Sequence, residues 1–152
     1  MVSLRLRSAV GPAITAHSGE ILKFIGDGVL AIFQNPALPA ESCRAAFDAA
    51  RAAQQRLHAI VLPDAELRAG IALHYGHVSY GNIGARDRLD FTVIGPDVNL
   101  TSRIEGMCDA LGHSLLMSER FAKLLSRPGV IGVGSHRLKG FAEPAQLFAW
   151  DH

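Results

Sequence analysis

Five polar residues of this sequence have types and spacings that could do chemistry. Lys23 interrupts an apolar run, Asp27 follows that run in an Asp-Gly pair, and Thr92 lies in a second apolar run. Asn99 and Arg103 are four residues apart, so on a helix they share one face. Ammonium and guanidinium groups bind anions, and carboxylates bind divalent cations such as Mg²⁺. Together, residues of these types could hold a charged ligand.

Each of the five also has an ordinary structural explanation. A lysine in an apolar strand protects a sheet edge from aggregation, which would account for Lys23. Asp27 fits a hairpin turn, and Thr92 is a β-branched residue typical of strands. Asn99 and Arg103 could be a solvated face beside an apolar helical stripe. Taken one at a time these explanations are favoured, so a functional role depends on how the surrounding stretches combine.

Local patterns predict the elements that would carry these residues. Two β-rich runs, 20–26 and 29–33, flank Asp27-Gly28, which is a strong hairpin signal. The remaining elements are a short helix between Pro12 and Gly19, a helix over 40–61, strands over 67–75 and 89–94 joined by a glycine-punctuated turn, a helix opening at Gly95-Pro96-Asp97, a strand over 114–118, a helix over 119–125, and closing strands over 130–138 and 146–150. This order predicts an α+β fold, with an antiparallel-rich sheet and helices packed on one face.

Composition limits the classes of function. The chain has 152 residues, 49% of them hydrophobic, and a net charge of +1, which fits one domain over residues 1–152. A net charge so close to zero does not indicate the basic surface that nucleic-acid binding requires. No apolar run approaches the roughly 20 residues that span a bilayer, so no membrane contact is expected. Cys43 and Cys108 lack the spacing of a zinc or redox motif and are interpreted as reduced thiols of a cytoplasmic protein.

Four stretches, read together, resemble the class III adenylyl and guanylyl cyclases. They are GEILKFIGDGVLAIF (19–33), GIALHYGHVSYGNIG (70–84), LDFTVIGPDVNLTSRIE (89–105) and LKGFAEPAQLFAW (138–150). They occur in the family's order and span nearly the whole chain. The threonine in FTVIG resembles many bacterial members. The resemblance implies a ferredoxin-like, palm-type sheet.

The resemblance also implies a reaction and its cofactors. Class III cyclases fold a nucleoside triphosphate so that its ribose 3′-hydroxyl attacks the α-phosphorus, which expels pyrophosphate. Two Mg²⁺ or Mn²⁺ ions, held by two aspartates, stabilise the attacking and leaving oxygens. Asp27 matches the second of those aspartates. An adenylate cyclase converting ATP to 3′,5′-cyclic AMP in signal transduction is therefore expected.

Roles for the other polar residues are carried over from the family position by position. Lys23 matches the residue that donates a hydrogen bond to the adenine ring, and Thr92 matches the acceptor for the adenine amino group. Asn99 matches the residue that orients the ribose. Arg103 matches the one that neutralises charge on the α-phosphate in the transition state.

The terminal phosphates would be held by a separate group of basic residues. Lys139 matches the family's phosphate-binding lysine, and Arg88 could assist it from a more variable segment. His74 and His77 are interpreted as core and turn residues and receive no role.

Because such enzymes place each active site between two protomers, a homodimer is expected, in which Asp27 serves one site and Lys23 the other.

One part of the family's pattern has no match in this chain. The first metal aspartate should precede Asp27 by roughly 40 to 50 residues, on an opening strand followed by a phosphate-binding loop. Only 26 residues precede Asp27, and their first acidic residue is Glu20. We therefore expect a catalytic domain without its first strand and helix, inactive by itself. An upstream regulatory region is left open.

Three other classes of function compete with an adenylate cyclase. A non-catalytic cyclase-homology module for dimerisation or regulation is the main alternative, although it has no physical need for the matched residues. The palm-like fold of the diguanylate cyclases also carries a hairpin with glycine and acidic residues, but the Asn99–Arg103 helix favours the class III family. RNA binding has the least support, since the charge is near neutral.

Overall fold

A computed structural model describes residues 10–25, 28–35, 37–59, 69–77, 79–82 and 91–150 of the chain. Residues 10–16 are helical and lead into the hairpin of β1 (Glu20–Ile25) and β2 (Gly28–Ile32). The two strands pair antiparallel, as the Asp-Gly signal predicts. A register shift between Ile21 and Lys23 marks an irregularity of the kind that twists a strand.

A four-stranded sheet forms the centre of the molecule. Its order is β3 (Ile71–Leu73), β6 (Leu115–Ser118), β8 (Ala145–Trp150) and β7 (Val130–His136). β3 runs parallel to β6, whereas the other two pairings are antiparallel. The predicted α+β class with an antiparallel-rich sheet is confirmed.

The helices cover both faces of this sheet, not the single face predicted. On one face α2 (Pro39–His58) and α5 (Glu119–Leu125) pack against Leu115 and Met117 of β6. On the other face α3 (Pro96–Glu105) and α4 (Cys108–Leu111) pack around Leu116 of the same strand. Successive residues of a strand point to opposite faces, so a strand buried along its whole length needs cover on both.

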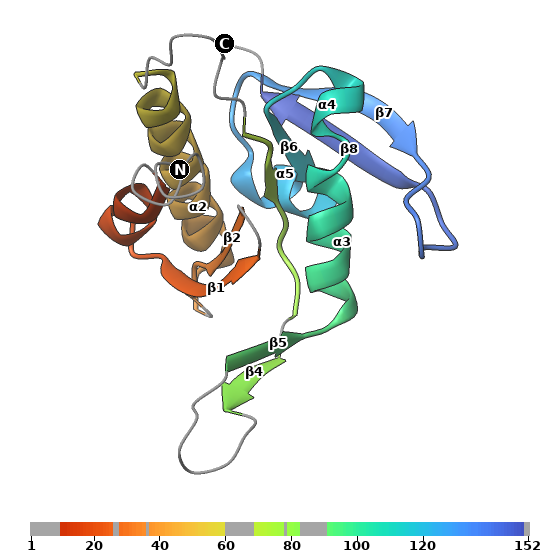
Figure 1. Ribbon diagram of the computed structural model, residues 1–152. Coiled ribbons are helices and arrows are strands. Elements are labelled where there is room, and N and C mark those ends of the chain that lie inside the picture. The colour runs from red at the N-terminus through yellow and green to blue at the C-terminus, as the bar shows by residue number, and fades with distance from the viewer. Residues whose placement is uncertain are drawn as a thin grey trace, which may run out of the picture.

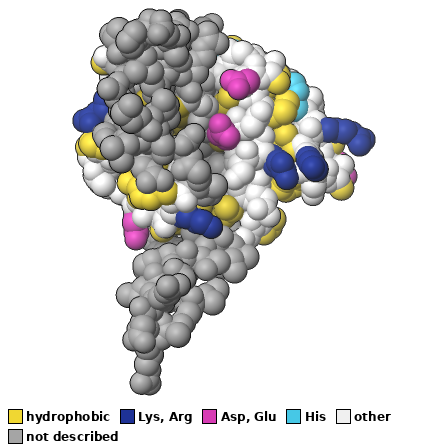
Figure 2. Space-filling view, in the orientation of Figure 1, with side chains coloured by type: hydrophobic (Ala, Val, Ile, Leu, Met, Phe, Trp, Pro, Cys, Tyr) yellow, Lys and Arg dark blue, Asp and Glu magenta, His cyan; other side chains and the backbone are white. Residues whose placement is uncertain are grey.

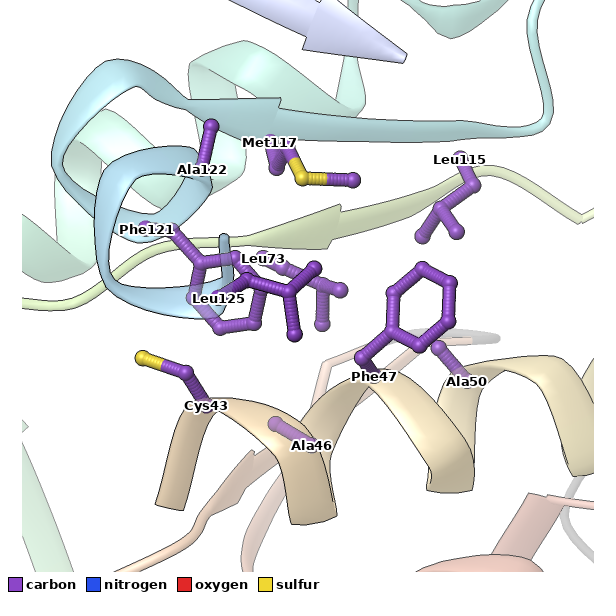
Figure 3. Close-up of a cluster of buried hydrophobic side chains, with 10 residues drawn as sticks. All are labelled: Cys43, Ala46, Phe47, Ala50, Leu73, Leu115, Met117, Phe121, Ala122 and Leu125. Carbon is purple, nitrogen blue, oxygen red and sulfur yellow. The ribbon is translucent and has the colours of Figure 1, made fainter. Parts of the chain in front are cut away.

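The larger hydrophobic cluster lies between α2 and the sheet. Figure 3 shows Phe47 and Cys43 of α2 pointing toward Leu73, Leu115 and the side chains of α5. Phe47 is 1% exposed, and its ring meets that of Trp150 edge-on, with centroids 5.5 Å apart. This contact ties α2 to the last strand of the sheet.

A second ribbon projects from the foot of α3, away from the central sheet (Figure 1). It pairs β4 (Ser79–Asn82) antiparallel with β5 (Phe91–Ile94). The sequence predicts β5 as a strand. It predicts the residues of β4 only as part of a glycine-punctuated turn. Glycine disfavours strands locally, so the partner strand decides that this segment is extended.

Candidate active site

β1 carries the first predicted site residue, Lys23. Lys23 pairs with Leu30 across the hairpin, and its side chain is exposed. Ile25, at the end of β1, pairs with Gly28, at the start of β2. Asp27, the predicted metal ligand, lies outside the described residues. An exposed lysine on this strand is free of the core and available to a ligand.

Thr92 lies on β5, where its backbone pairs with Gly81 of β4. β1 and β5 contact one another, but they belong to separate two-stranded sheets. The strands that carry Lys23 and Thr92 thus lie close together, although among the described residues they are not paired in one sheet.

α3 presents Asn99 and Arg103 outward on its exposed side. Gly95 precedes the helix with φ 149°, a conformation that favours glycine, and Pro96 occupies the first turn. Ile104 is completely buried on the opposite side, among residues of β6 and β8. The predicted division of this helix into an apolar stripe and a polar face is confirmed.

Lys139 lies in the turn after β7 and is exposed. It stands between Leu138, which is 4% exposed, and Gly140, whose φ is 90°. Because the buried side chain of Leu138 anchors the turn, the backbone position of Lys139 is fixed. Arg88, its predicted helper, lies outside the described residues.

The chain does not bring all of these residues together. In Figure 1 the β1–β2 hairpin and the connection between β7 and β8 lie on opposite sides of α3. Lys23 and Lys139 therefore lie on elements that α3, which carries Asn99 and Arg103, separates in this view.

Sequence reasoning missed a buried polar network beside α3. Asp97, in the first turn of the helix, accepts a hydrogen bond at 2.7 Å from Nε2 of His74 and one at 3.0 Å from the backbone N–H of His77. Nδ1 of His74 lies 2.7 Å from Oγ of Ser118. The side chain of His74 is 6% exposed, so its interpretation as a core residue is correct but incomplete. No spacing rule predicts this network, because its members are 23 and 44 residues apart.

The network controls the ionisation of Asp97. Partial burial acts to raise the pKa of this carboxyl group. The hydrogen bonds from His74 and His77, with the charge of Arg120, outweigh that effect and hold the pKa below its ordinary value. Asp97 is accordingly a carboxylate at neutral pH and acts as a hydrogen-bond acceptor.

The family of the chain follows from comparison with known sequences. Residues 8–144 match the family described as the adenylate and guanylate cyclase catalytic domain. The chain belongs to this family. That match includes every site residue discussed above, from the hairpin lysine to Lys139.

Two bacterial relatives support the assignment of this cyclase domain. Adenylate cyclase 1 of Rhizobium meliloti is 37% identical over 112 residues, which cover 69% of the chain and 16% of that protein. An adenylate cyclase of Anabaena cylindrica is 34% identical over 132 residues, which cover 80% of the chain and 25% of that protein. The cyclase domain thus spans a quarter or less of the length of these two relatives.

Solved structures agree with the fold of the cyclase domain. The adenylyl cyclase CyaB from P. aeruginosa is 26% identical with a TM-score of 0.76, over 99% of this chain and 81% of that one. The guanylyl cyclase Cya2 is also 26% identical, with a TM-score of 0.71 over 98% of this chain and 78% of that one. Overall likeness therefore does not separate an adenylyl from a guanylyl cyclase.

The described residues of the cyclase domain carry charged side chains of both signs on their surface. Acidic and basic side chains are interspersed on the face shown in Figure 2. Among the described residues, no three His, Cys, Asp or Glu side chains come together to hold a metal ion. Within that same part of the chain, no helix is long and apolar enough to cross a membrane.

Proposed function

We propose that this cyclase domain belongs to an adenylate cyclase that converts ATP into 3′,5′-cyclic AMP and pyrophosphate. The observation that carries the proposal is the pair of Asn99 and Arg103, exposed on one side of α3 while Ile104 holds the other side in the core. A helix anchored in this way presents an amide and a guanidinium from a rigid base. These are the groups that a ribose and a phosphate in transfer require.

The reaction forms one bond and breaks another. The ribose 3′-hydroxyl loses its proton to solvent as its oxygen bonds to the α-phosphorus, and the bond from that phosphorus to the oxygen leading to the β-phosphate breaks. Negative charge grows on the phosphate oxygens as the bonds exchange. Arg103 offsets this charge, and Asn99 holds the ribose so that its 3′-oxygen faces the phosphorus. Lys139 binds the pyrophosphate that leaves.

The base of the substrate is proposed from Lys23 and Thr92. An ammonium donor suits the unprotonated N1 of adenine, whereas guanine carries a hydrogen at N1 and requires an acceptor. The threonine hydroxyl accepts from the amino group of adenine. These two groups favour ATP over GTP. The overall similarity of the chain to known cyclases does not distinguish between the two nucleotides.

Mg²⁺ is the proposed cofactor, with Asp27 as one ligand. When bound, the ion neutralises phosphate charge and stabilises the attacking and leaving oxygens. Asp27 is the single residue of the chain that matches a metal role in the family, so the 152 residues alone should be inactive. The proposed unit is a homodimer in which one protomer supplies metal ligands and its partner supplies Lys23, Thr92, Asn99 and Arg103.

Cyclic nucleotide production by the full-length gene product tests this proposal. With ATP and Mg²⁺ it should form cyclic AMP, and Arg103→Ala should lower kcat by at least a hundredfold. Arg137→Ala is the matched control, because Arg137 is an exposed arginine without a role in the site. A full-length product that forms no cyclic nucleotide, or an Arg103→Ala variant as active as the control, would overturn the proposal.

Complementation tests the shared site. Mixing the 152-residue chain with a full-length Arg103→Ala variant should restore part of the activity, because this chain then supplies Arg103 to a site whose metal ligands are intact. Mixing it with a full-length Asp27→Ala variant should restore none. Robust activity from the 152-residue chain alone would show that another residue supplies the second metal ligand.

A further inference from the structure

Each hydrogen bond around His74 has a defined donor and a defined acceptor. A carboxylate only accepts hydrogen bonds, so Nε2 of His74 carries the hydrogen that faces Asp97. In the neutral imidazole, Nδ1 then accepts from the hydroxyl of Ser118. Ser118 in turn accepts from the backbone N–H of Phe121 at 3.3 Å and so caps the start of α5. Every group is satisfied, and the chain of hydrogen bonds links the start of α5 to the start of α3.

The carboxylate of Asp97 is held from several sides. His74 and His77 donate to its two oxygens, and Gly76 lies directly against it, with no room for a β-carbon between them. The backbone carbonyl of Asp97 accepts from the hydroxyl of Thr101 at 2.7 Å. The first turn of α3 therefore has a fixed attachment to the segment after β3.

α3 is held at its first turn by Asp97 and further along by two residues of its apolar stripe, Leu100 and the fully buried Ile104. Asn99 and Arg103 lie within this stretch. Without the hydrogen bonds of Asp97, only the apolar packing of Leu100 and Ile104 would fix the rotation of the helix about its axis. With side chains about 5–6 Å from that axis, a rotation of about 20° would move their ends by roughly 2 Å.

We propose that Asp97, backed by His74 and Ser118, is a positioning residue that fixes the rotation of α3 and thereby places Asn99 and Arg103. This inference rests on the proposed function, because it gives the network a purpose in the cyclase reaction. A misplacement of about 1 Å in an active site can cost roughly a hundredfold in rate. Asp97 touches no substrate in this account and acts through the helix alone.

Kinetics of the full-length gene product separate positioning from loss of stability. Asp97→Ala should lower kcat at least tenfold and change KM for ATP less than threefold, because the groups displaced act in the transition state. Asp97→Asn keeps an acceptor for His74 but turns its NH2 group toward the N–H of His77, so it should recover part of that loss. Leu125→Ala is the control: Leu125, the last residue of α5, is buried on the opposite face of the sheet, in the cluster that includes residues of α2. It should lower Tm at least as much, yet keep kcat within threefold at a temperature where it is folded.

Nuclear magnetic resonance and hydrogen exchange on the same product give a readout that needs no activity. The ¹⁵N spectrum should show His74 with its hydrogen on Nε2, and Asp97→Ala should abolish that preference. Backbone amides of residues 98–101 should exchange at least tenfold faster in Asp97→Ala than in Leu125→Ala. If Asp97→Ala does not fold, Asp97→Asn takes its place, with smaller changes in the same direction.

The outcomes distinguish the two proposals. Unchanged exchange in α3, or a kcat for Asp97→Ala within threefold of wild type, would overturn the positioning role while leaving cyclase activity intact. A wild-type product that forms no cyclic nucleotide would overturn the proposed function. In that case the exchange of residues 98–101 alone decides whether Asp97 fixes the helix.

Discussion

Gly76 and Asp97 approach so closely that a β-carbon on Gly76 would lie 2.6 Å from Oδ1 of Asp97. The two residues come from different elements, since Gly76 follows β3 and Asp97 opens α3. Real β-carbons do not tolerate such a distance, so Gly76 is required by space and not by its backbone angles. The contact brings the segment after β3 directly against the helix that carries Asn99 and Arg103.

Substituting this glycine should destabilise the protein. Gly76→Ala forces Asp97 away from His74 or shifts the helix, and overpacking of this kind costs about 1–3 kcal/mol. Thermal or urea unfolding measures the change. Gly106→Ala is the control, because Gly106 has φ −60° and its nearest neighbour to an added β-carbon is 3.5 Å away. The control should be neutral or slightly stabilising. Equal effects of the two substitutions would contradict the close contact.

The two cysteines should be unreactive in the folded protein. Cys43 and Cys108 are 1% and 4% exposed. Burial raises the pKa of each thiol to about 11, and the charge of Glu105 adds to the effect at Cys108. Little thiolate exists at neutral pH, and the thiolate is the reactive form. A colorimetric thiol reagent at pH 7.5 should label neither cysteine in buffer and both in guanidinium chloride. Rapid labelling in buffer would mean that the packing around α2 or α4 opens readily.

The same thiols should make stability fall in alkali. A thiol in the unfolded chain loses its proton near its ordinary pKa of 9.0, whereas the folded thiols keep theirs until about 11. Between these values the unfolded state binds fewer protons, so the free energy of unfolding falls as pH rises from about 9 to about 11. Urea unfolding across this range should show a steeper fall for wild type than for the double variant Cys43→Ala, Cys108→Ala. Parallel curves would argue that the thiols are hydrated in the folded state.

Phe47 should carry a large share of the packing between α2 and β8. Besides its edge-on contact with Trp150, its ring lies 4.8 Å from the guanidinium carbon of Arg127. Phe47→Ala removes these contacts and leaves a cavity, which typically costs about 3–5 kcal/mol. Leu38→Ala is the control, since Leu38 is 51% exposed and surface changes usually stay within about 0.5 kcal/mol. Denaturant unfolding should separate the two variants clearly. A loss below about 1 kcal/mol for Phe47→Ala would mean that α2 is not held through this ring.

Base specificity should follow Lys23 and Thr92. In the full-length gene product, Lys23→Glu with Thr92→Cys should weaken use of ATP and improve use of GTP. Each mismatched hydrogen-bonding group in a closed site costs about 1–3 kcal/mol. The ratio of kcat/KM for the two nucleotides measures the shift. Lys123→Glu, at an exposed lysine of α5, is the charge-matched control. An unaltered preference for ATP in the double variant would show that other residues read the base.

Much of the fold follows from residues that are neighbours in the sequence. Asp27-Gly28 between two β-rich runs predicts the hairpin, and the strands pair as expected. Gly95-Pro96 and the apolar spacing after it predict α3, including which side is buried. Turn chemistry, capping and periodicity act over a few residues, so one sequence suffices to read them. The motifs for Lys23, Asn99, Arg103 and Lys139 are equally local, and the family match covers them all.

Relationships between distant residues were decided by the tertiary structure alone. The sequence does not show that β3 runs parallel to β6, or that helices cover both faces of the sheet. It shows neither that a glycine-rich segment becomes β4 nor that His74 joins Asp97 and Ser118. Each of these depends on a partner many positions away in the sequence. A hydrogen bond or a packed face stabilises the protein only when the rest of the fold brings that partner into place. The sequence thus determined which chemical groups the protein carries, and the tertiary structure decided which of them act on one another.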